Sequence, residues 1–433
     1  MSLFSFKLLK HKRRLSLKLN QFTMSRFLVY PLVFLSILSF NCSGNSKSKI
    51  SSSLKSDSTI TPVETKEPNS KYKSSFIGQT RIQGIKTVTK YSFKVLTEKL
   101  NSPWGMTSLP DGRLLITEKA GNLRIVKTNG EMSEKISGLP KVDENGQGGL
   151  LGITLDPDFV LNRMVYWAFA EPVSGGNHTA VAKGRLSNDE SKIENAVVIY
   201  RATPSHKGNL HFGGRVLFDK NGYLFVSTGE RSDKTTRPQA QQLNSSLGKI
   251  IRITKDGLPA PGNALAKMPE AKPELYSYGH RNVQGLTINP VDGDLWSNEF
   301  GPRGGDEINH VVAGNNYGWP TITYGIEYGG NKIGEAIQQK EGMMQPVYYW
   351  DPSVSPSGMT FYTGSQVSEW KNNLFVGCLS GMHIARLVIK DNKVIGEERL
   401  LSDEFQRFRD VHQGKDGALY AVTDQGRLYW IGK

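Results

Sequence analysis

The sequence predicts an all-β protein, folded as a six-bladed β-propeller of four-stranded blades. From residue 91 onward, short runs of β-branched and aromatic residues alternate with Gly, Asp and Asn turns. Long stretches of helical periodicity are scarce in the same region. A tight Asp-Gly or Asn-Gly turn followed by a strand recurs along it. Such repetition of short strands is typical of propellers.

The recurring unit predicts the elements in order. Its turns lie at 110–112, 219–222, 292–293 and 415–417, and each leads into an apolar strand. Two further strands, at 163–168 and 373–377, are predicted after polar turns. Units of about 40–60 residues over some 340 residues correspond to about six blades. We expect residues 91–98 to close the ring by pairing with residues 427–432. A long pair of β-sandwiches is the alternative architecture.

The net charge of +14 does not belong to the predicted propeller. Residues 1–41 carry seven Lys and Arg residues and no acid, and residues 42–90 carry a surplus of six basic residues. The rest of the chain is therefore near neutral. A near-neutral domain gives no electrostatic reason to expect nucleic acid binding.

The first 41 residues are predicted to be an export signal. A basic stretch ends at Arg26 and leads into the apolar segment 27–38, which has the length of a signal-peptide core and is short for a transmembrane helix. Cys42 follows this core and resembles the acylated cysteine of bacterial lipoproteins, although Phe40 and Asn41 are larger than the residues usual there. The alternatives are a plain signal peptide and an uncleaved anchor. We expect an exported protein, in the periplasm or at the cell surface, lipid-anchored to a bacterial membrane.

Residues 42–90 are predicted to be a flexible tether before the propeller domain 91–433, because they are rich in Ser, Lys and Thr and poor in apolar residues. Met24 is a possible true start, which would remove residues 1–23 from the protein. The second cysteine, Cys378, lies in an apolar run. We expect it to be a buried strand residue rather than a reactive thiol.

Functional residues of a propeller are expected in the loops at one face of its central channel. Gln147 stands among glycines that allow close approach of a ligand, although a simple turn would also explain the pattern. His211 stands at the entry to a strand, where an imidazole can act as a general base; a structural histidine is the alternative. Arg407 and Arg409 lie on one face of a predicted strand, where a surface pair is the alternative.

Two further segments suit an anionic or metal-bound ligand. Arg281 and Asn282 place a cationic donor beside an amide donor. Gly301 and Pro302 begin a turn that is followed by carboxylates. Carbonyl and carboxylate oxygens are the hard ligands that Ca²⁺ prefers.

Taken together, the ordered segments are specific. Residues from about 98 to 433 resemble the soluble aldose sugar dehydrogenases that depend on pyrroloquinoline quinone (PQQ), the glucose/sorbosone dehydrogenase family. The matching sequences are GQGGLLGITLDPDF, HFGGR, LGKIIRI, YGHRNVQGL, EFGPRGGDEIN, GNNYGWP, PSGMTFYTG and RFRDV. The resemblance implies a propeller enzyme with PQQ over the channel and Ca²⁺ beside it. Such an enzyme oxidises aldoses at the anomeric carbon to lactones by hydride transfer to the quinone.

The resemblance also implies roles for individual residues. His211 is the expected base for the proton of the anomeric hydroxyl. The expected contacts to PQQ come from Gln147, Arg281, Asn282, Arg407 and Arg409, with the last two facing its carboxylates. The expected calcium ligands are the carbonyls of Gly301 and Pro302 at the PQQ site, and Glu307 and Tyr317 at a second, structural site.

One position departs from the family's pattern. Some members place a lysine against PQQ where this chain has Ser380, so one positive partner of the cofactor is missing. The expected partners are a small aldose, an external electron acceptor and, through the lipid anchor, a membrane; the chain is expected to be a monomer or homodimer.

Two other functions fit a propeller. A calcium-dependent lactone hydrolase would leave the arginine pair without a clear purpose. A non-catalytic surface lipoprotein that binds a glycan or a protein is favoured by the lost lysine and the anchor.

Overall fold

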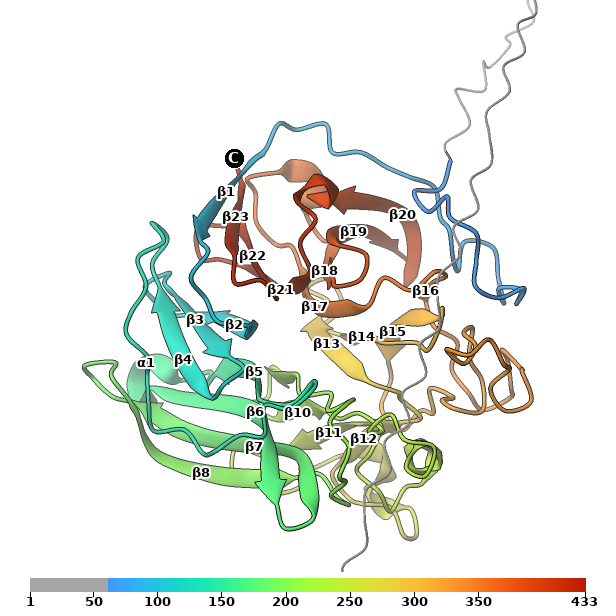
Figure 1. Cartoon of the computed structure of the whole chain (residues 1–433), viewed down its shortest axis with the longest axis horizontal. Helices are drawn as coiled ribbons and strands as arrows, with labels where there is room; N and C mark the ends of the chain where they lie inside the picture. Colours follow the sequence, from blue (N-terminus) through green and yellow to red (C-terminus); the bar gives the residue numbers. More distant parts are fainter. Residues whose placement is uncertain (1–60) are drawn as a thin grey trace, which may run out of the picture. The chain divides into compact units, whose positions relative to one another are not determined.

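The computed structural model describes residues 61–433, which form six antiparallel sheets arranged in a ring (Figure 1). The first blade contains β2 (Pro103–Ser108), β3 (Leu114–Glu118) and β4 (Asn122–Val126). The second contains β5 (Leu150–Leu155), β6 (Met164–Val173), β7 (Gly176–Leu186) and β8 (Ile193–Arg201). The third contains β9 (Val216–Phe218), β10 (Leu224–Ser227), β11 (Lys249–Ile253) and β12 (Leu275–Tyr278).

The chain continues around the ring in the same way. The fourth blade contains β13 (Val283–Ile288), β14 (Leu295–Glu299), β15 (Asp306–Val311) and β16 (Tyr348–Trp350). The fifth contains β17 (Pro356–Phe361), β18 (Leu374–Cys378), β19 (His383–Lys390) and β20 (Lys393–Leu400). The sixth combines β21 (Phe408–Gln413), β22 (Leu419–Thr423) and β23 (Leu428–Gly432) with β1 (Ser92–Thr97).

Helices in the described part of the chain are short. They are α1 (Phe159–Asn162) and the 3₁₀ turns η1 (Arg237–Gln241), η2 (Ala264–Lys267), η3 (Ser368–Trp370) and η4 (Ser402–Glu404). Within residues 61–433, no helix is both long and apolar enough to cross a membrane. The predicted signal and the predicted lipidation site Cys42 lie outside the described residues.

The structure confirms the prediction of an all-β, six-bladed propeller. Five blades have four strands. In the first blade, isolated bridges from Met132 and Ile136 to β4 occupy the fourth position in place of a regular strand. The predicted turns also form, and Gly112, Gly222 and Gly417 adopt positive φ angles of 90°, 77° and 80°, which glycine accepts without steric cost.

The ring closes as predicted from the sequence. β1 pairs antiparallel with β23, and the register joins Ser92 to Gly432 and Val95 to Tyr429. The first strand of the propeller is therefore the outer strand of the last blade. In Figure 1 the two strands lie side by side.

A separate apolar core fills each of the six interfaces between neighbouring blades. In β3, Leu115 packs toward the second blade, whereas Leu114 and Ile116 pack toward the sixth. In β18, Leu374 and Phe375 likewise belong to different cores. Since successive side chains of a strand point to opposite faces and both faces of a blade are covered, the middle strands are buried at every position. Cys378 ends one such run and is fully buried, as expected.

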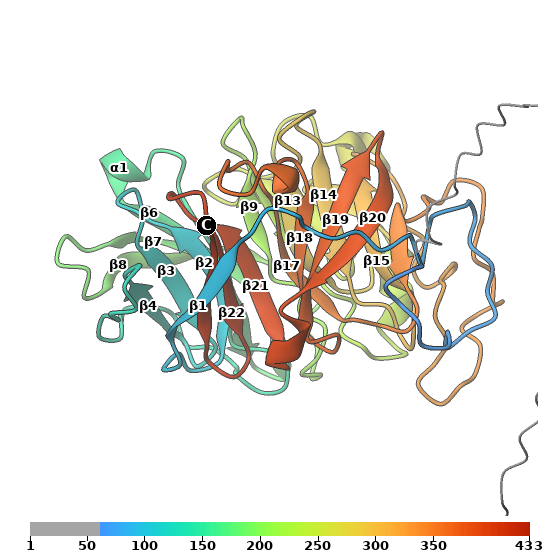
Figure 2. The ribbon, with the colours of Figure 1, turned by 90° about the horizontal axis from the view of Figure 1, so that it is seen from above.

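Residues 61–90, which we name the strap, differ from the flexible tether expected for residues 42–90. In Figures 1 and 2 the strap runs from β1 past the fifth blade toward β15 and β16. The Ile85 amide donates to Glu397 O at 2.9 Å, and Thr87 bonds the Glu398 carboxylate through its amide and its hydroxyl. Gln79 is fully buried. The strap's polar composition indicated disorder, but its polar groups pair with partners more than 250 residues away in the sequence.

Candidate active site

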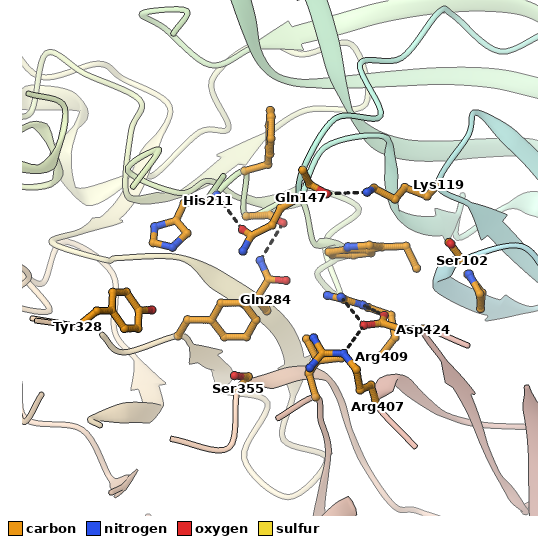
Figure 3. A pocket seen from close by; sticks show the side chains of 17 residues that line it. Ser102, Lys119, Gln147, His211, Gln284, Tyr328, Ser355, Arg407, Arg409 and Asp424 are labelled. Atoms are coloured by element: carbon orange, nitrogen blue, oxygen red, sulfur yellow. Dashed lines mark hydrogen bonds and ion pairs between the residues drawn. The ribbon is translucent and has the colours of Figure 1, made fainter. Parts of the chain in front are cut away.

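Loops from all six blades enclose a cavity of about 460 Å³ at one face of the channel (Figure 3). Its aromatic walls are Trp104, Phe212 and Phe300, and its charged groups are Lys119, Arg407, Arg409 and Asp424. Gln147, His211 and Gln284 complete the polar lining. A cavity of this size accommodates a small organic ligand.

His211 projects into this cavity from the segment before β9 (Figure 3). Its backbone has a φ of 49°, and its amide donates to Gln147 Oε1 at 2.8 Å. Nδ1 lies 2.6 Å from Glu230 Oε1, so Nδ1 carries the proton and Nε2 is left as the acceptor. Burial, and then the positive charge of Arg281, lower the pKa of His211 to about 4. The imidazole is therefore neutral near pH 7 and able to accept a proton.

Gln147 and Asn282 support the histidine side of the cavity. Gln147 lines the cavity and fixes the His211 backbone through its side chain. Asn282 is fully buried, and its Oδ1 accepts from the Gly213 amide at 2.9 Å and from Gln284 Nε2 at 3.2 Å. Its Nδ2 has no hydrogen-bond partner among the described residues. Asn282 is not among the residues that line the cavity, so it acts on the cavity wall through Gly213 and Gln284.

Arg409, in β21, and Arg407, just before this strand, face the cavity and share one carboxylate. Asp424 accepts from Arg407 Nε at 2.9 Å and from Arg409 Nε at 2.8 Å. Burial raises the pKa of Asp424, but the two guanidinium groups outweigh it and hold the pKa below its usual value. The trio therefore keeps one net positive charge. The surface-pair alternative does not apply to Arg409, which is largely buried at this wall.

Lys119 adds a positive charge that the sequence analysis missed. It follows β3, and its Nζ donates to Gly146 O at 2.6 Å. Burial, followed by the charge of Arg409, lowers the pKa of Lys119. Figure 3 shows Lys119 and the arginine pair on the side of the cavity away from His211. Glu230 and Asp424 were also missed; all three follow a strand of the repeated unit, which is the signal that could have identified them.

Arg281 does not line the main cavity. Its Nη1 donates to the carbonyls of Phe300 and Gly301 at 3.0 and 2.6 Å, and its guanidinium lies 5.2 Å from the Trp319 ring centre. The arginine thus holds the loop that carries the expected calcium ligand Gly301. A carbonyl oxygen has two lone pairs and can accept this bond while binding a cation.

Gly301 and Pro302 lie in a second cavity of about 320 Å³. It shares Phe300, Tyr328 and Ser355 with the main cavity. Ser380, at the position of the missing lysine, also lines it and bonds the Ser355 hydroxyl at 2.8 Å.

Glu307 and Tyr317 meet in a small third cavity, together with Glu299. Glu299 and Glu307 are directly opposite each other in the β14–β15 ladder. Burial, and then the charges of Glu299 and Asp306, raise the pKa of Glu307 well above its usual value. Like charges in such positions repel, so the pair suits a divalent cation. The Tyr317 hydroxyl is occupied, since it donates to His310 O and accepts from the Val312 amide, both at 2.8 Å. The backbone carbonyl of Tyr317 is its second oxygen that can serve as a ligand.

Within residues 61–433, no group of three or more His, Cys, Asp and Glu side chains is arranged to hold a metal. The expected calcium ligands are mainly carbonyls, so they would not form such a group.

Comparison with known proteins identifies the family. The family model for glucose/sorbosone dehydrogenase matches residues 100–430. Aldose sugar dehydrogenase YliI of Escherichia coli K12 is 43% identical over 335 residues, covering 77% of this chain and 90% of that protein. The crystal structure of the soluble E. coli aldose sugar dehydrogenase in its apo form matches 79% of this chain and 99% of its own, with a TM-score of 0.75 and 41% identity.

A further solved structure carries the cofactor. The PQQ-bound aldose sugar dehydrogenase of Streptomyces coelicolor is 30% identical, covers 80% of this chain and 99% of its own, and has a TM-score of 0.65. The resemblance predicted from the sequence is confirmed: the chain belongs to the glucose/sorbosone dehydrogenase family.

Proposed function

We propose that this chain oxidises aldose sugars at the anomeric carbon to lactones, with PQQ and Ca²⁺ as cofactors. The observation that carries the proposal is the main cavity, which places a neutral histidine opposite a group of three cations. The PQQ-bound relative, at 30% identity, supports the choice of cofactor.

The residues present fit PQQ, a flat quinone with three carboxylates. Lys119, Arg407 and Arg409 would hold the carboxylates, and the aromatic walls would pack against the ring system. Asn282 lies behind this wall, where its Oδ1 holds the Gly213 amide and the Gln284 side chain that line the cavity. When bound, PQQ supplies the hydride acceptor and Ca²⁺ supplies Lewis acidity beside it, from the Gly301 and Pro302 carbonyls.

His211 then carries out the proton transfer. Its Nε2 accepts the proton of the anomeric hydroxyl as the C1–H bond breaks and the lactone C=O bond forms. Glu230 fixes the ring through Nδ1 and stabilises the positive charge that the imidazole gains. Gln147 holds the histidine backbone in its left-handed conformation.

Dye-linked oxidation of a panel of aldoses, with and without added PQQ and Ca²⁺, tests the proposal. Activity that requires both is expected. His211→Ala should lower turnover about 10²–10⁴-fold while PQQ still binds. The matched control is His206→Ala, a histidine outside the cavity that lies 3.6 Å from Asp233, which should leave turnover unchanged. Unchanged turnover in His211→Ala would overturn the assignment of the base. No PQQ binding by the wild type would favour a binding propeller, and lactone turnover with calcium alone would favour a hydrolase.

We also propose that the protein is exported and anchored through an acylated Cys42, and that an external acceptor reoxidises the cofactor. The basic and apolar N-terminal sequence supports export. Incorporation of labelled palmitate into the wild type and not into Cys42→Ala would support the anchor, and equal labelling would refute it.

A further inference from the structure

We propose that the strap, residues 61–90, is a positioning element of the active site that holds the loops 301–306 and 350–355 in place. This rests on the proposed function, because those loops carry the expected calcium carbonyls. The strap precedes the region 100–430 that the family model matches.

The central observation is the environment of Asp351. This carboxylate is only 5% exposed. Its Oδ1 accepts from the amide of Asn69 at 2.8 Å and from Asn69 Nδ2 at 2.9 Å. Its Oδ2 accepts from the amide of Ser70 at 3.1 Å and from the Ser70 hydroxyl at 3.2 Å. All four donors belong to the strap. A buried charge without donors is strongly unfavourable, so these four strap donors compensate the burial of Asp351.

Asp351 lies where the two loops meet. Gly304 has a φ of 82°, and a Cβ added there would lie 2.6 Å from Asp351 Oδ1. The amides of Gly304 and Gly305 donate to Ser353 Oγ at 2.9 Å and to Trp350 O at 2.8 Å. Any movement of Asp351 therefore shifts the loop that begins with Gly301 and Pro302.

Asn69 joins both loops directly. While its amide nitrogens bond Asp351, its Oδ1 accepts from Arg303 Nε at 3.0 Å. It also lines the second cavity, beside Gly301 and Pro302. A third strap residue, Arg81, donates to Asp351 O at 2.7 Å. The strap thus contributes a side chain to the wall of the candidate site.

The contacts of the strap with the fifth blade serve as the internal comparison. Glu64 forms an ion pair with Arg399 at 2.9 Å. Glu64→Gln removes this pair and leaves Asp351 with all its donors, whereas Asn69→Ala removes the side chain that joins the loops.

Amide hydrogen exchange in the ligand-free full chain tests the proposal without depending on activity. In Asn69→Ala the amides of Gly304 and Gly305 should exchange about tenfold faster, the ratio for loss of one net hydrogen bond. In Glu64→Gln they should exchange as in the wild type. Equal exchange in Asn69→Ala and the wild type would overturn the proposal.

A second readout is specific for positioning. We expect Asn69→Ala to raise the Ca²⁺ dissociation constant of the PQQ-loaded protein several-fold, with no change in Glu64→Gln. If Asn69→Ala and Glu64→Gln weakened Ca²⁺ binding equally, the strap would be a general stabilising segment and not a positioning element. If exchange changes as expected but the wild type binds neither PQQ nor Ca²⁺, the strap's role stands and the proposed function falls.

Discussion

Four charged side chains line the main cavity. Among its three cations, Lys119 is the one without a carboxylate partner in the described part of the chain. Arg407 and Arg409 share Asp424, whereas the ammonium group of Lys119 bonds one carbonyl, Gly146 O. Its charge is therefore the most available to an incoming carboxylate. Ser380, on the fifth blade, stands where some family members place a lysine, and it carries no charge. Lys119 supplies a positive charge from the first blade.

Lys119→Met is accordingly expected to weaken PQQ binding about tenfold, the scale of one charge-assisted contact, without changing the protein's stability greatly. Lys119→Arg should retain most of the affinity. The PQQ affinity is measured by titration followed by absorbance at two ionic strengths. It should depend more strongly on salt in the wild type than in Lys119→Met. Lys141→Met, at an exposed position, is the control. Equal affinity in Lys119→Met and the wild type would contradict the assignment.

Single residues also limit what the sequence could predict. His211 and Gln147 could be identified because they stand beside glycines within specific segments. Glu230, which sets the tautomer of His211, lies 19 residues further along and could not be paired with it from spacing alone. The contact of Arg281 with the quinone stays a prediction, whereas the bonds of its guanidinium to the Phe300 and Gly301 carbonyls were not predicted.

At the scale of elements, the cross-strand pair Glu299 and Glu307 opposes the pairing of β14 with β15. The raised pKa of Glu307 means that the folded protein takes up a proton there more readily than the unfolded chain does. Without metal, this contribution to stability is present at low pH and is lost as pH rises through the folded-state pKa. Ca²⁺ must displace the same proton, so its binding should strengthen as pH rises.

We therefore expect Ca²⁺ to raise the melting temperature more at pH 8 than at pH 5.5, and EDTA to remove the difference. Glu307→Gln should raise the melting temperature in EDTA, since it removes the repulsion, and should abolish much of the calcium response. Glu341→Gln, at an exposed position, should behave as the wild type. A full calcium response in Glu307→Gln would place the metal elsewhere. Differential scanning fluorimetry gives all of these values.

The elements differ in how far local sequence determines them. The turn at Gly112 and the strand after it could be predicted, because a glycine in a tight turn and a short apolar run after it are local properties of the sequence. The strap could not, because its order comes from donors that meet Asp351 some 280 residues away. Polar composition predicts disorder only where such partners are lacking.

For the whole molecule, the sequence predicted the six blades and the closing pair β1 and β23, because repeats and chain ends can be read directly. The packing of one blade against the next could not be predicted, since each core between blades is built from residues of two repeats.

The closed ring leads to a specific prediction about the cooperativity of unfolding. In an open array of repeats, the terminal interface frays independently. In this ring, β23 is the partner of β1 and also packs Leu428 into the core between the sixth and first blades.

Leu428→Ala should therefore destabilise the whole ring, as an internal truncation would. Leu428 and Leu224 are both fully buried, the latter in the core between the second and third blades. Each substitution should lower the free energy of unfolding by about 2–5 kcal/mol. Urea unfolding followed by tryptophan fluorescence and by circular dichroism should give coincident transitions in both variants. If Leu428→Ala instead produced an early, separate transition while Leu224→Ala unfolded in one step, the closing interface would be a local contact. The ring would then owe its stability to the five internal interfaces alone.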